Sequence, residues 1–526
     1  NAAIAPANLS NVYVTDSADT DSSLIRLTGD NDIQVQNGNS SGSTGGTNKT
    51  AFIEADIRFE GGTMTLVVQD GADDVDLEIS GTIRDDTNGG RTVQKTEEGT
   101  VRLTATNNLF NVLQIYEGTA QVVSDGSVGD NDIQLGNNNT RGQLEYIGTG
   151  GSINNQFRLG DNDTGTTAGN IVNSGTGLLT LNSGTFNEAR ASATTNRELL
   201  IGGSSDIEIT GVIVDNVAGV AKVAINKSGS NTLTLSGDST FTGNTTVSEG
   251  GLRLDGSLTS NVTFADMTAA GGDGSTTGNI SFAGANITLN VDASTNAGLT
   301  TASELISTGG NVTVDFGGTT GSNNIVIVDY GTYTGTVGSE FQLASGTTTS
   351  ARGGAGTIVD DTLNSQITVN LGFLELTWNN ASTNSLWDGN TSANWTTGRS
   401  DTTYFDGDSV TFSDTGSGTV TLSNGGSTIA PGKVIFDNAL TSSYSINAST
   451  TETLTVAPGG GLQILTDNSS ADITIDAELV GSGVIVKGRT VVGASNVGQT
   501  IITGNNTNFT GTTLINQGDV QIDNVN

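Results

Sequence analysis

The chain has 526 residues, of which 14% are charged and 33% hydrophobic, with 74 glycines, no cysteine and no histidine. These absences exclude disulfides, thiolate metal sites, histidine-ligated zinc and the Ser-His-Asp and Cys-His nucleophilic sites. A formal net charge of −36 disfavours binding to nucleic acid and anionic membranes, and no apolar run is long enough to predict membrane insertion in this segment.

The first 20 residues are predicted to form an extended cap. They begin with Asn1 and the small, nearly uncharged stretch NAAIAPANLS, which fits a chain that has lost a signal peptide or a fragment of a larger secreted protein. Unpaired strand edges join other chains. We therefore expect Val12, Tyr13 and Val14 to add a strand to a neighbouring copy, and contacts of this kind that do not close into a ring build filaments. The expected partner is thus the chain itself, in a head-to-tail homopolymer.

A short acidic turn recurs in the first third of the chain. GDNDIQ occurs at 29–34 and 129–134, and GDND again at 160–163. Carboxylate oxygens suit Ca²⁺. The same residues are also common in ordinary turns, because Asp, Asn and Gly favour turn conformations. The D-x-D-x-D-G calcium loop with its distant Glu is absent. The candidate calcium ligands are Asp30, Asp32, Asp130, Asp132, Asp161 and Asp163, and no other cofactor is predicted.

A second acidic cluster comprises Asp70, Asp73, Asp74 and Asp76. Paired carboxylates can hydrolyse glycosidic bonds, and this is the chemistry that remains open to a chain without histidine. Aspartate and glycine at this density are typical of an exposed turn, and no matching second cluster follows. We therefore assign no catalytic residue, and a polysaccharide-cleaving enzyme is the weakest of the functions considered.

Three segments share one pattern. DLEISG (76–81), DIEITG (206–211) and DITIDA (472–477) each open a unit, and a lysine follows in each: Lys95, Lys227 and Lys487. Farther along, FTGNTTVSEGGLRLD (241–255) aligns without a gap to FTGTTLINQGDVQID (509–523). In the first unit Leu109 takes the place of the phenylalanine, and Gly118 aligns with Gly250 and Gly518. The lysines are interpreted as side chains that extend over apolar coils towards water, without a catalytic role.

Short strands with one buried face are predicted along the whole chain. Apolar residues alternate with polar ones in three clear runs: Ile287, Leu289, Val291; Val312, Val314, Phe316; and Ile367, Val369, Leu371. Repeating units that cannot close their own core must stack on their neighbours. The predicted fold is therefore all-β, an elongated right-handed parallel β-helix (β-solenoid) of roughly 20–25 residues per coil, with apolar ladders inside and Asn and Thr ladders outside.

Two solenoid modules are expected after the N-terminal cap. The first spans 21–374, with repeats near 76–123 and 206–258, and the second spans 375–526, with a repeat near 472–523. All three tryptophans, Trp378, Trp387 and Trp395, fall at the start of the second module. They are interpreted as a plug or cap of a coil, and the alternative is an exposed aromatic patch that stacks on surface glycans.

The stretch KSGSNTLTLSGDSTFTGNTTVSEGGLRLDGSL (227–258) resembles the autotransporter-associated β-strand repeat of large bacterial surface proteins, and 487–523 resembles a second copy. The resemblance implies a β-helix displayed at the cell surface or outside the cell. The function it favours is a non-enzymatic structural protein that assembles end to end into a fibre. The alternative is a surface adhesin that binds glycan.

Overall fold

The structure is a computed structural model. It describes residues 12–15, 24–27, 31–35, 50–85, 90–137, 140–160, 167–183, 185–188, 196–215, 221–291, 298–308, 310–316, 324–345, 356–416, 418–437, 440–457, 461–465, 471–488 and 498–523. Contacts divide the chain into two compact units. Unit 1 is Asn1–Leu289, Leu299–Val312 and Tyr330–Thr336, and unit 2 is Asn290–Gly298, Thr313–Asp329 and Val337–Asn526.

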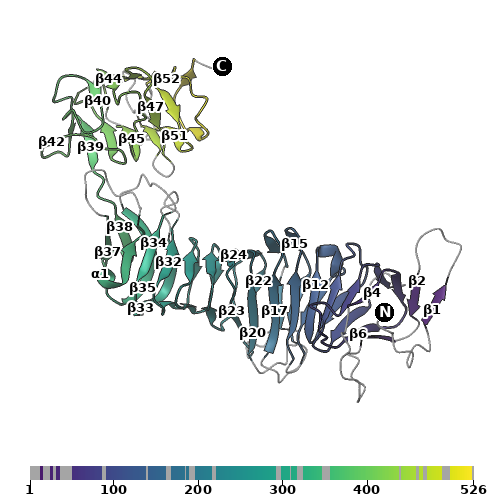
Figure 1. Cartoon of the computed structure of the whole chain (residues 1–526). Coiled ribbons are helices and arrows are strands. Elements are labelled where there is room, and N and C mark those ends of the chain that lie inside the picture. The colour runs from purple at the N-terminus through teal and green to yellow at the C-terminus, as the bar shows by residue number, and fades with distance from the viewer. Residues whose placement is uncertain are drawn as a thin grey trace. The chain divides into compact units, whose positions relative to one another are not determined.

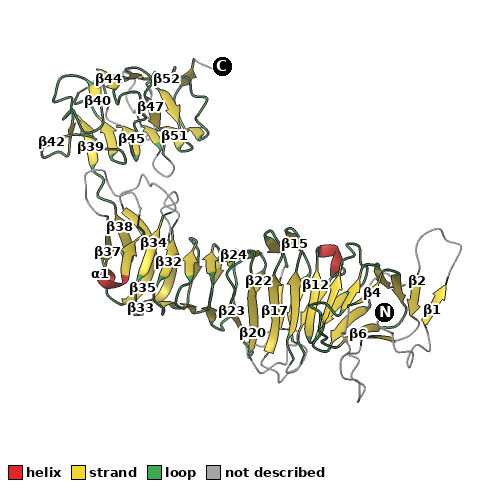
Figure 2. Ribbon diagram, viewed as in Figure 1, coloured by secondary structure: helices red, strands yellow, loops and turns green. Residues whose placement is uncertain are grey.

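The described residues are almost entirely strands and turns (Figures 1 and 2). Helical structure among them is confined to the single-turn α1 (Val337–Glu340) and one 3₁₀ turn (Asp125–Ser127). No helix in this part of the chain is long and apolar enough to cross a membrane. The abundance of Gly, Thr, Asn and Ser explains the result, because these residues favour strands, turns and caps over helix interiors.

Unit 1 is a stack of short parallel strands, and the chain returns to the same sheet after each coil. Strand β23 (Val223–Lys227) leads to β24 (Thr232–Leu235) in a second sheet, and β25 (Thr245–Val247) then pairs with β23 in parallel. Strand β26 (Gly251–Leu254) pairs with β24 in the same way. This confirms the predicted parallel β-solenoid.

Coil length varies more than the predicted 20–25 residues. Asn244 and Asn261 stack across a coil of 17 residues, whereas Gln143 and Asn170 stack across 27. The difference lies in the turns between strands, since insertions in surface loops cost little free energy.

Identical or similar side chains stack at successive coils of unit 1. Inside, the rings of Phe157 and Phe186 lie parallel with centroids 4.6 Å apart, and both are fully buried. Outside, Asn182 donates to Asn154 over 3.1 Å and Thr210 donates to Asn182 over 3.0 Å. Both predicted kinds of ladder are therefore present, and each links one coil to the next.

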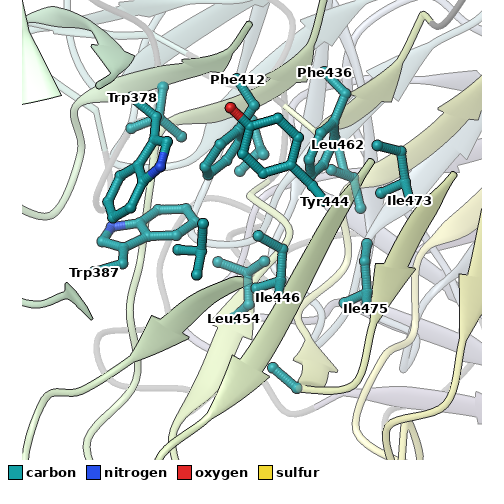
Figure 3. Close-up of a cluster of buried hydrophobic side chains, with 14 of the residues drawn as sticks. Trp378, Trp387, Phe412, Phe436, Tyr444, Ile446, Leu454, Leu462, Ile473 and Ile475 are labelled. Atoms are coloured by element: carbon teal, nitrogen blue, oxygen red, sulfur yellow. The ribbon is translucent and has the colours of Figure 1, made fainter. Parts of the chain in front are cut away.

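Unit 2 has a core of its own that runs from Leu376 to Ile502. Figure 3 shows Trp378 and Trp387 beside Phe412, with Phe436 and Tyr444 following at the next positions. The rings of Phe412 and Phe436 stack at 4.9 Å on the partner strands β43 (Ser409–Phe412) and β45 (Lys433–Phe436). As in unit 1, aromatic side chains at matching positions of successive coils stack to form the core.

The three alternating runs are buried as predicted, with no apolar member more than 8% exposed. One assignment is wrong. In the first unit Leu109 is 48% exposed, and Phe110 is the fully buried residue. The alignment on Gly118 placed Leu109 opposite Phe241, but the turn of the first unit differs by one residue, and a one-residue shift moves a strand side chain to the opposite face.

Strand β1 (Val12–Thr15) contains the three residues expected to donate a strand to a neighbouring copy. It pairs antiparallel with β2 (Leu24–Leu27) of its own chain, whereas β2 pairs in parallel with β5 (Asp56–Phe59). The sheet order is β1-β2-β5-β8, where β8 is Ile83–Asp85, so β1 lies at an edge among the described strands.

Candidate functional site: the repeated lysine corners

Each repeat unit contains a buried lysine at the end of a strand. Lys95 lies in β9 (Thr92–Thr96), Lys227 ends β23, and Lys487 ends β51 (Val484–Lys487). All three side chains are 0% exposed. We call each lysine, with the aspartate that opens its unit and the glycine that aligns with Gly250, a lysine corner.

The ammonium groups are enclosed by backbone carbonyls. Nζ of Lys227 donates to the carbonyls of Ser228 (2.7 Å), Gly229 (2.9 Å) and Glu249 (3.2 Å). The first two follow Lys227 directly and form the bend after β23, whereas Glu249 belongs to the next coil. One buried cation therefore satisfies the carbonyls of a bend and ties that bend to the next coil, which an apolar side chain could not do.

The corner of Lys95 repeats this arrangement, whereas Lys487 bonds a carbonyl 11 residues farther along the chain. Nζ of Lys95 donates to the carbonyls of Thr96 (2.9 Å), Glu97 and Glu117 (3.1 Å). Lys487 donates to the carbonyl of Gly498 over 2.8 Å. The lysine backbones also match, since the carbonyl of Lys227 accepts the amide of Ser248 and that of Lys487 accepts the amide of Asn516, both at 2.8 Å.

The aligned glycines close the corners. Gly118, Gly250 and Gly518 have φ of 68°, 68° and 92°, a region that strains other residues. At Gly250 a Cβ would lie 2.4 Å from the carbonyl oxygens of Gly229 and Asn231 and 2.8 Å from Nζ of Lys227. The repeat therefore keeps glycine here because the lysine and its carbonyls occupy the space of a side chain.

The aspartate that opens each unit accepts a backbone amide at the start of a later strand. The donors are Thr100 to Asp76 (2.8 Å), Thr232 to Asp206 (2.8 Å) and Gln499 to Asp472 (2.9 Å). Each carboxylate also acts electrostatically on the lysine of its own corner. The aspartate of the D-x-E/T-I motif thus supplies part of the negative charge around each ammonium, after Glu117 at Lys95 and Glu249 at Lys227.

Burial is the dominant influence on these lysines. It lowers the pKa of Lys95, Lys227 and Lys487 to about 8, against the opposing effect of nearby carboxylates. At pH 7 the amines are therefore mainly charged and engaged as donors. The interpretation that they extend towards water is wrong, because all three side chains are 0% exposed. A protonated amine with no access to solvent is unsuited to nucleophilic catalysis.

The candidate calcium ligands do not converge within the described residues. Asp32 is exposed in β3 (Asn31–Val35), and Asp132 in β13 (Asp132–Leu135) pairs with Arg158 at 2.7 Å. Four strand spacings separate β3 from β13 in one sheet, or about 19 Å at about 4.8 Å each. Asp130 is exposed, whereas Asp30, Asp161 and Asp163 lie outside the described residues.

The tryptophans lie inside the core of unit 2. Trp378, Trp387 and Trp395 are each 0% exposed and meet in edge-to-face contacts with centroids 4.9–5.1 Å apart. The indole N–H of Trp378 donates to the carbonyl of Gly416 over 2.8 Å. They form an internal plug. These three residues expose no aromatic surface on which a glycan could stack.

The acidic cluster at 70–76 separates into two roles. Asp76 is buried and accepts amides from Gly71 and Thr100, so it is part of a lysine corner. Asp73 and Asp74 are exposed and line a hollow of about 430 Å³.

Glu452 is a buried carboxylate that no sequence pattern predicted. Glu452 is 2% exposed and accepts the amides of Asn424, Gly426 and Thr450 and the hydroxyl of Ser449, at 2.7–3.2 Å. Burial raises the pKa of Glu452, but the hydrogen bonds together have the larger effect and lower the pKa to about 2. Glu452 lies outside the three repeat units identified in the sequence, so no repeat pointed to it.

Comparison with known families finds one match, the Passenger-associated-transport-repeat, at residues 225–254 and 495–522. Both matches end at aligned positions of the two copies and include the corner glycines Gly250 and Gly518. The first also includes Lys227. The resemblance to an autotransporter passenger repeat is thus confirmed for these two segments. A search of curated proteins and of solved structures found no significant match.

Proposed function

We propose that this chain is a structural passenger segment of a bacterial protein displayed at the cell surface or secreted, and that its function resides in the stacked solenoid itself. The passenger-type repeat implies surface or secreted localisation. The observation that carries the proposal is the recurrence of the lysine corner in the same repeat. The buried ammonium groups of Lys95 and Lys227 each bond carbonyls of two successive coils and so join them.

A rigid spacer requires links between neighbouring coils along its length. The corners, the internal ring stacks and the external polar ladders each provide such links. Because each coil pairs with the coils next to it, stability is expected to accumulate coil by coil. The resulting body can hold a distant segment away from the membrane without any chemical activity of its own.

Electron microscopy of the purified protein tests this proposal. A structural solenoid should appear as rods or as filaments of uniform width. Compact particles without an axis would contradict it. An assay for release of reducing ends from polysaccharides should give no activity, and activity abolished by Asp74→Asn would instead support an enzyme.

The finer part of the proposal is end-to-end assembly. The last described coil, formed by β53 (Thr512–Ile515) and β54 (Val520–Ile522), exposes Leu514, Ile515 and Ile522 at 47–54%. These side chains suit contact with a further coil, and we propose that a second copy provides it. Strand β1, which departs from the parallel pairing of its neighbours, is the proposed donor.

A further inference from the structure

A hollow on the outer face of unit 1 combines an exposed aromatic ring with convergent polar groups. It is lined by Thr50, Phe52, Ala72, Asp73, Asp74, Val75, Glu78 and Arg102. The floor is formed by outward side chains of three adjacent parallel strands, β4 (Ala51–Ile53), β7 (Leu77–Ile79) and β10 (Thr100–Leu103). The wall is the turn between β6 (Thr63–Val68) and β7, which holds the two exposed aspartates.

Phe52 is the unusual residue of this hollow. Its side chain is 65% exposed, although a phenylalanine on a strand normally contributes by burial. The turn beside it is fixed, because the amide of Thr50 donates to Asp73 (3.0 Å) and the hydroxyl of Thr50 donates to the carbonyl of Val75 (2.7 Å). The ring is thus presented to solvent by an ordered frame.

A row of hydrogen-bonding side chains leads away from the ring. Register places Phe52 beside Glu78, Glu78 beside Arg102, Arg102 beside Gln121 and Gln121 beside Glu145. Arg102 contacts Glu78 at 3.4 Å and Gln121 at 2.8 Å, and Gln121 donates to Glu145 over 3.0 Å. The row spans four strand spacings, or about 19 Å at about 4.8 Å each.

We propose that this hollow and row bind a chain of uncharged hexopyranose sugars, with one sugar face stacked on Phe52 and successive hydroxyls bonded along the row. A pyranose offers an apolar C–H face to an aromatic ring and paired hydroxyls to planar carboxylate, amide and guanidinium groups. The row advances by one strand spacing per side chain, which suits a polymer with one repeating unit per step.

The charges select against acidic sugars. Among the described residues of the hollow and the row, Asp73, Asp74, Glu78 and Glu145 accompany one cation, Arg102, and the whole chain carries −36. An anionic polysaccharide would meet repulsion here, which weakens in high salt. A neutral glycan avoids this penalty. The proposal goes beyond the structural role, since a spacer needs no ligand.

Isothermal titration with neutral oligosaccharides of two to six hexose units tests the proposal, with polygalacturonate as the anionic comparison. Affinity should increase with chain length up to about the span of the row, and the polyanion should bind at least tenfold more weakly at low salt. Phe52→Ala should weaken binding at least tenfold without changing the thermal midpoint. Leu363→Ala, which truncates a residue 95% exposed in unit 2, is the matched control and should bind as the wild type does.

A second variant tests whether a longer oligosaccharide extends from Phe52 along the row to Glu145. Glu145→Ala should weaken binding of the longest oligosaccharide and leave binding of the disaccharide unchanged. The proposal is overturned if no neutral oligosaccharide binds at millimolar concentration, if Phe52→Ala binds normally, or if polygalacturonate binds best. These results are independent of whether the protein forms rods, so the structural proposal stands or falls separately.

Discussion

At the residue scale, the corners show why a few polar residues recur in an otherwise degenerate repeat. Sequence alignment identified Lys95, Lys227 and Lys487 but gave them the wrong environment. A lysine next to apolar positions usually reaches solvent, and the carbonyl cage arises from a bend and a neighbouring coil that a linear pattern does not bring together. The corner also requires the positive φ of Gly250. The recurrence of this glycine in the three units was visible in the sequence.

Lys227→Met should destabilise unit 1 strongly. The methionine fits the space but leaves the carbonyls of Ser228, Gly229 and Glu249 without their buried donor, which we expect to lower the free energy of unfolding by about 3 kcal/mol. Urea unfolding followed by circular dichroism measures this. Lys222→Met, at an exposed lysine of the same coil, is the control, and an equal loss in both variants would show that the cage contributes nothing.

The corner lysines also give stability a pH dependence of defined sign. The pKa of Lys227 is about 8 in the folded protein against 10.5 as its ordinary value, so between these pH values the unfolded chain binds more protons. Stability therefore rises with pH across this window, as the cost of burying the charge disappears. The thermal midpoint of the wild type relative to Lys227→Met should increase from pH 7.5 to pH 10. A constant difference would contradict the shift.

At the element scale, the strands were largely predictable and the turns were not. Alternation located Ile287, Val312 and Ile367 on buried faces because a strand repeats every two residues whatever its surroundings. The one-residue error at Leu109 and Phe110 arose in a turn, where no period applies. The spread of coil lengths has the same origin. The tryptophan plug could be proposed from three clustered aromatics, but its burial needed the packed core of unit 2.

Phe241→Asp tests the register of the repeat. Phe241 is fully buried, whereas its neighbours Thr240 and Thr242 are exposed. An unpaired carboxylate in the core should cost more than 4 kcal/mol or prevent folding. Thr240→Asp is the better control, because the hydroxyl of Thr242 bonds Asp215, and it should change the thermal midpoint little. Similar losses in both variants would place Phe241 on the wrong face.

At the scale of the whole molecule, charge and stacking act in opposite directions. A net charge of −36 keeps separate copies apart in solution. Exposed Leu514, Ile515 and Ile522 and the edge strand β1 favour association. Calcium could shift the balance by screening or bridging carboxylates, even though the described aspartates form no cluster suited to a metal ion. Assembly should therefore be strongest where the repulsion is screened.

The last prediction concerns this balance. Deletion of residues 1–15 removes Val12, Tyr13 and Val14 and should leave a folded but monomeric protein by light scattering, whereas the 526-residue chain is expected to form filaments. Deletion of residues 1–11 retains β1 (Val12–Thr15) and should still assemble, which separates loss of the strand from loss of chain length. Leu514→Asp should also abolish assembly, because it places a charge on the proposed contact, whereas Leu363→Asp should not. If the 526-residue chain is monomeric at high concentration, with and without calcium, end-to-end assembly is refuted and the protein acts as an isolated spacer.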